Sequence, residues 1–62
     1  MDLSLYLESR NISKKEFALM VGVSPGAISN YCSRMRIPTL EIALKIVEKT
    51  NKHVTLKDLL KK

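Results

Sequence analysis

At 62 residues the chain is long enough for one domain, expected to span residues 1–62, and its single cysteine excludes both a disulfide and a cysteine-rich zinc site. No apolar run is long enough to cross a bilayer, and the N-terminus lacks the basic start of a signal peptide. Eleven Lys and Arg against six Asp and Glu give a net charge of +5, which favours nucleic acid as a partner, ahead of an anionic membrane.

The whole chain is expected to form an all-α domain, since β-branched residues nowhere alternate with a period of two. A first helix is expected over residues 3–10, with Asp2 as its N-cap. One face of this helix carries Leu3, Tyr6, Leu7 and Arg10.

The next helix is expected over residues 14–21 and has a clear start. Ser13 and Glu16 form a capping-box pattern, in which each side chain bonds the backbone N–H of the other. Gly22 follows, where a left-handed residue would end the helix. The inward face of this helix carries Phe17, Ala18 and Val21.

A third helix is expected from Pro25 to Ser33 or Arg34, with Ser24 as N-cap and Pro25 at the first helical position. A short turn containing glycine between two helices is typical of a helix-turn-helix. Gly22 permits the sharp turn, and the small side chain of Ala18 lets the two helices approach closely.

Gly26 lies inside the first turn of that third helix, where glycine costs up to ~1 kcal/mol relative to alanine. One interpretation is that the missing side chain lets the helix N-terminus approach a DNA backbone or base edge. The other is that glycine is simply tolerated near a helix end.

A fourth helix is expected over residues 38–49 and a short fifth one through Leu60, opened by the capping pair Thr55 and Asp58. The core stripe of the fourth helix is predicted to be Leu40, Ala43, Leu44 and Val47. A surplus of apolar residues beside it is either further core or a small dimer surface, for which the candidates are Ile42, Ile46, Val54 and Leu60.

The segment SKKEFALMVGVSPGAISNY, residues 13–31, resembles the helix-turn-helix of the Cro and phage-repressor type, which commonly reads T-Q-x-x-L-A-x-x-x-G-V-S-x-x-x-I-S-x-[WY]. Ser13 stands for the threonine and Lys14 for the glutamine, and direct matches are Gly22, Val23, Ser24, Ile28, Ser29 and Tyr31. Residues 36–60 resemble the closing pattern of the same family. The resemblance implies a compact five-helix, lambda-repressor-like bundle. The chain departs from the family after the third helix, with Cys32 and Arg34 where members often carry an acidic residue and a glycine.

The resemblance also implies double-stranded DNA as partner, with the third helix in the major groove. The base-reading candidates are the residues of that helix not needed for packing: Pro25, Gly26, Ser29, Asn30 and Ser33. An asparagine amide can both donate to and accept from an adenine, whereas serine is permissive. On spacing alone, a plain solvated helix face is the simpler interpretation of these polar residues, and the resemblance over nearly the whole chain reverses that preference.

Phosphate contacts are expected to flank the groove and to supply affinity and register rather than sequence choice. The candidates are Lys14, Lys15, Ser24, Arg34 and Arg36. Lys14 replaces a family glutamine that grips the DNA backbone, and Arg34 adds a charge on the side where DNA is expected. The remaining lysines are interpreted as solvating charges: Lys45, Lys49, Lys52, Lys57, Lys61 and Lys62.

The sequence therefore predicts a Cro-like repressor that acts by occupying a palindromic operator, as a weak homodimer, in the cytoplasm of a bacterial cell or a phage-infected host. No catalytic constellation, cofactor, metal site, membrane contact or small-molecule ligand is expected. Two other classes stay open. One is an antitoxin or adaptor that uses this fold to bind a protein, and the other is a non-specific, nucleoid-type DNA binder.

Overall fold

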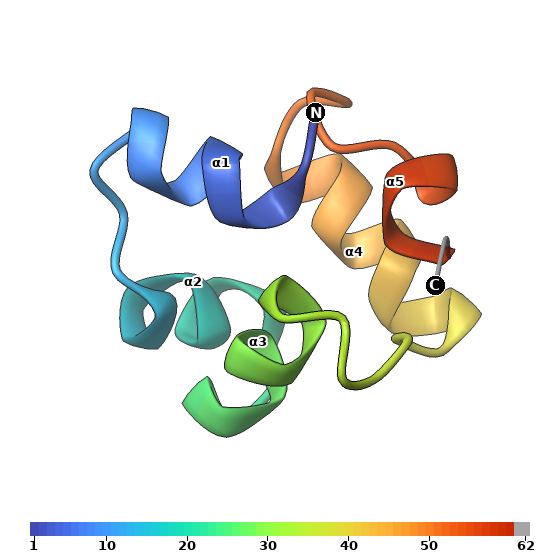
Figure 1. Ribbon diagram of the computed structural model, residues 1–62, viewed down its shortest axis with the longest axis horizontal. Helices are drawn as coiled ribbons and strands as arrows, with labels where there is room; N and C mark the ends of the chain where they lie inside the picture. Colours follow the sequence, from blue (N-terminus) through green and yellow to red (C-terminus); the bar gives the residue numbers. More distant parts are fainter. Residues whose placement is uncertain (61–62) are drawn as a thin grey trace.

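The computed structural model describes residues 1–60, in which five helices pack as an all-α bundle (Figure 1). They are α1 (Leu3–Ser9), α2 (Lys14–Val21), α3 (Pro25–Cys32), α4 (Leu40–Lys49) and α5 (Leu56–Leu60). The predicted five-helix architecture, with α2 and α3 as the helix-turn-helix, is confirmed. Lys61 and Lys62, expected to be solvating charges, lie outside the described residues. Within residues 1–60 no helix has the length and apolar character to cross a membrane, and no surface pocket is found.

The predicted capping residues form the predicted bonds at the helix starts. Asp2 accepts from the backbone N–H of Leu5, and Ser13 and Glu16 bond each other's backbone as a complete capping box. Ser24 accepts from the backbone N–H of Ala27, with Pro25 at the first helical position. Because these bonds join residues three apart, the sequence was sufficient to predict them.

The corner between α2 and α3 depends on the backbone of Gly22, which has φ of 85°. Its N–H and that of Val23 both donate to the carbonyl of Ala18, at 2.8 and 3.0 Å, and so satisfy the end of α2. A side chain on Gly22 would meet nothing within 4 Å, so the left-handed conformation, not lack of space, favours glycine here. Ala18 and Ile28 are both buried where the two helices pack.

The predicted core stripe of α4 is wrong for two of its four members. Leu40 and Leu44 are 60% and 50% exposed, whereas Ile46 is fully buried beside Ala43. The buried face instead runs through Ala43, Ile46 and Thr50, spaced three and four residues apart. The sequence analysis instead assigned Ile46 to the surplus apolar residues beside the core stripe.

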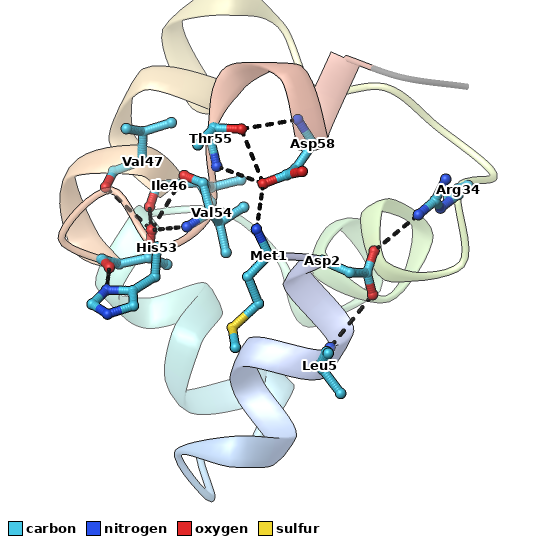
Figure 2. A network of polar contacts seen from close by, with 11 residues as sticks. Met1, Asp2, Leu5, Arg34, Ile46, Val47, His53, Val54, Thr55 and Asp58 are labelled. Atoms are coloured by element: carbon cyan, nitrogen blue, oxygen red, sulfur yellow. Dashed lines mark hydrogen bonds and ion pairs between the residues drawn. The ribbon is translucent and has the colours of Figure 1, made fainter.

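Thr50 can be fully buried because its hydroxyl is satisfied inside the protein. The hydroxyl donates to the carbonyl of Ile46, at 2.9 Å, and accepts from the backbone N–H of Val54, at 3.2 Å (Figure 2). A buried hydroxyl with both partners carries little penalty. These bonds therefore close the turn after α4 and let the Ile46 face pack inward.

Because α4 buries the face that contains Ile46, the predicted dimer surface also has to be corrected. Ile46 and Val54 have no exposed surface, so neither can line an interface between two copies. Ile42 is partly buried and packs against the core. Of the four candidates only Leu60, at 43% exposed, is clearly available.

The N-terminus of the chain is joined to α5. The Met1 ammonium group lies 2.7 Å from Oδ2 of Asp58, and the same oxygen accepts from the backbone N–H of Thr55 (Figure 2). The bond from the ammonium group, followed by the bond from Thr55, lowers the pKa of Asp58 to about 2. The predicted Thr55–Asp58 pair at the start of α5 thus also fixes residue 1 against that helix.

Candidate nucleic-acid interface

The α3 helix forms part of one edge of the molecule, with its N-terminal end at the bottom of Figure 1. Ile28 is its one buried residue, and it anchors the helix to the core. Pro25, Gly26 and Ser33 are exposed, while Ser29 and Asn30 are half-buried. All five predicted base-reading residues therefore have some solvent-exposed surface. Ser29 and Asn30 are more buried than residues on a fully solvated helix face would be.

The polar groups of α3 are only partly used within the protein. The Ser24 hydroxyl accepts from Ala27 at the helix start, and the Ser33 hydroxyl donates to the carbonyl of Asn30 at 3.3 Å. Within residues 1–60, no hydrogen bond engages the side-chain amide of Asn30, which leaves its donor and its acceptor available to a ligand.

Gly26 is not required by packing within the protein. A Cβ placed there would meet only the Ser24 hydroxyl oxygen, at 3.9 Å, which is ordinary van der Waals contact. Gly26 also does not have the left-handed backbone that favours glycine at Gly22. An alanine would therefore fit in the free protein, and any demand for glycine at this position comes from outside the chain.

Exposed basic side chains come from the start of α2 and from the loop after α3. Lys14 and Lys15 are exposed in the first turn of α2, and Arg36 is exposed in the loop after α3. Burial raises the pKa of the Cys32 thiol on α3, while the charge of Lys14 lowers it and that of Asp2 raises it. Lys14 and Asp2 thus both lie close enough to the end of α3 to act on one thiol.

Arg34, one of the predicted phosphate contacts, pairs with a carboxylate of the protein itself. Its Nη2 atom lies 3.2 Å from Oδ1 of Asp2, in a pair whose side chains are 50% and 37% exposed (Figure 2). The sequence offered no local signal for this pair, because its partners are 32 positions apart. Sequence reasoning assigned Asp2 only the N-cap of α1.

The backbone of Arg34 is also unusual, with φ of 64° in the left-handed region. That conformation costs an L-residue about 1–2 kcal/mol. An exposed ion pair contributes ~0.2–1 kcal/mol, so the Asp2 pair does not offset the backbone cost. The ion pair with Asp2 therefore does not explain why an arginine occupies this left-handed position.

Comparison with known proteins agrees with this geometry. The sequence model of a family described as helix-turn-helix matches residues 3–57, which is nearly the whole chain. The comparisons with curated proteins and with solved structures gave no significant match. The matched range includes the capped α2, the left-handed corner and the exposed α3 described above. The chain thus belongs to the helix-turn-helix family of the Cro and phage-repressor type, a family of DNA-binding regulators.

Proposed function

We propose that this protein is a sequence-specific repressor that occupies a palindromic operator, with α3 in the major groove of double-stranded DNA. The observation that carries the proposal is the α3 surface: a buried Ile28 anchors it, and an unengaged Asn30 amide lies between two serines. In helix-turn-helix complexes the corresponding helix contacts base edges with its N-terminal residues. Repression is by occupancy, in the cytoplasm where the operator DNA lies.

Asn30 has the main role in base recognition. Its amide NH₂ can donate to N7 of an adenine while its amide oxygen accepts from the adenine N6 amino group. A paired contact of this kind discriminates an adenine by about 1–3 kcal/mol. Ser29 and Ser33 add contacts that accept more than one base. The exposed side chains of Lys14, Lys15 and Arg36 supply phosphate contacts. The Ser24 hydroxyl, at the N-terminus of α3, supplies another.

One copy of the chain is too small to read a full operator. The described residues measure 23 × 21 × 18 Å, whereas the two half-sites of such operators lie about 34–36 Å apart. Two copies related by a two-fold axis would cover both half-sites. We therefore include a weak homodimer in the proposal.

The dimer surface we assign keeps Leu60 from the candidates predicted from the sequence and replaces the other three by exposed residues on and next to α4. Leu40 and Leu44 lie one turn apart on α4, and α5, which ends at Leu60, packs against that helix. Glu41 and Lys45 are exposed on α4 and carry opposite charges, which suits contact with an identical surface. The exposed aliphatic side chains of this surface are Ile37, Leu40, Leu44 and Leu60.

The test is selection of bound fragments from random DNA at a stated salt concentration. The proposal expects a palindromic consensus and a ratio of specific to non-specific affinity of ~10³ or more. Asn30→Ala should lower affinity about 5- to 150-fold for the consensus and relax the preference at one position of each half-site. Lys57→Ala, on α5, is the matched surface control.

Two results would reject this function. Equal affinity for all sequences at each salt concentration would indicate a nucleoid-type binder. Absence of DNA binding, together with partner binding that persists in Asn30→Ala and Lys14→Ala variants, would indicate a protein-interaction module.

A further inference from the structure

The residue type at the left-handed position after each of the first four helices is unusual only after α3. After α1, α2 and α4 the chain turns with a left-handed Asn11, Gly22 and Asn51, respectively. Glycine and asparagine are the residues that adopt this conformation most readily. After α3 the corresponding residue is Arg34, which has no such preference. Lys52 is also left-handed, but it follows Asn51 rather than taking its place.

The side chain of Arg34 does not explain this choice through its contact with Asp2. The pair is exposed, and one carboxylate oxygen meets one guanidinium nitrogen, at 3.2 Å. Such a pair is weak and is readily exchanged for another anion. The other oxygen of Asp2 accepts from the backbone N–H of Leu5, at 3.4 Å, so Asp2 has a second, independent role at the start of α1 (Figure 2).

The location of the pair connects it to the candidate nucleic-acid interface. Arg34 comes two residues after the last residue of α3, and the exposed Arg36 follows in the same loop. Asp2, at the start of α1, meets Arg34 because α1 packs against α3. The Arg34 guanidinium therefore lies in the loop that directly follows α3, together with an arginine that the proposed function places against phosphate.

We propose that Asp2 is an internal substitute for a DNA phosphate, which holds Arg34 in the free protein and competes with DNA for it. On binding, the guanidinium leaves the carboxylate for a phosphate oxygen, a partner it can bind through two parallel hydrogen bonds. Asp2 thereby lowers the affinity for DNA without contacting it. The inference rests on the proposed function, since it assumes that the α3 side of the molecule faces DNA.

Asp2→Asn separates the two roles of this residue. Asparagine is as good an N-cap as aspartate, so α1 keeps its cap, while the negative charge on Arg34 is removed. We expect the affinity for operator DNA to rise about 1.5- to 5-fold, as expected for release of one exposed ion pair. In an Arg34→Gly background, Asp2→Asn should give less than half of that gain. A fall or no change in affinity, or the same gain without Arg34, would overturn the inference.

Arg34→Gly and Lys52→Gly form a matched pair of variants. Each replaces a left-handed basic residue by glycine, so each should raise the thermal midpoint, and neither is expected to fail to fold. The turn that contains Lys52 lies on the opposite side of the molecule from the start of α3 (Figure 1). Only Arg34→Gly should reduce the slope of log affinity against log salt, by about 0.9 for one lost phosphate contact.

The outcomes distinguish this inference from the proposed function. If the wild-type protein shows no specific DNA binding, the proposed function fails. If it binds its operator but Arg34→Gly keeps the wild-type salt slope, the function stands and the role of Arg34 and Asp2 is refuted.

Discussion

Replacement of Gly26 by alanine tests whether DNA approaches the start of α3 closely. In the free protein the added Cβ meets only the Ser24 hydroxyl oxygen, at 3.9 Å, so no clash opposes the change. Alanine also lowers the entropy of the unfolded chain, and the expected gain is about 0.4–1 kcal/mol. For a domain of this size, that gain raises the thermal midpoint by roughly 2–8 °C.

The same methyl group has the opposite effect on binding if DNA lies against Gly26. A displacement of the helix N-terminus that removes one paired base contact costs about 1–3 kcal/mol, or roughly 5- to 150-fold in affinity. The assays are thermal unfolding followed by circular dichroism and titration of labelled operator DNA. A variant that is more stable and binds DNA as well as the wild type would refute the close approach and show that glycine is merely tolerated.

Three further changes test the fold and its assembly. Thr50→Val leaves the buried N–H of Val54 without its acceptor, so it should destabilise the protein by about 1–3 kcal/mol in urea titrations, whereas Thr50→Ser should keep the bond and cost less. Because the pKa of Asp58 is about 2, below its ordinary 3.8, its contribution to stability is complete above pH ~4 and is lost as the pH falls towards 2. Urea midpoints of wild type and Asp58→Asn should thus converge in that acid range, and a constant difference would contradict the assignment. Leu44→Lys, at a 50% exposed position, should abolish concentration-dependent dimerisation in sedimentation while leaving the monomer folded, whereas an unchanged dimer would exclude this surface.

The sequence was sufficient for every feature that depends on residues a few positions apart. The caps at Asp2, Ser13 and Ser24 and the left-handed Gly22 each join neighbours in the chain, so residue types and spacing predicted them. The same local signals located the corner between α2 and α3. The helix boundaries were correspondingly close, with α1 ending at Ser9 rather than Arg10.

Only the tertiary structure decided which of two apolar stripes of α4 faces inward and which anion meets Arg34. Leu40 and Leu44 suit a core as well as Ile46 does, but in the packed structure Ile46 faces inward together with Thr50, whose hydroxyl is hydrogen-bonded inside the protein. Asp2 and Arg34 meet because α1 packs against α3. Such contacts join residues far apart in the chain, so they follow from how the helices pack and not from any local pattern.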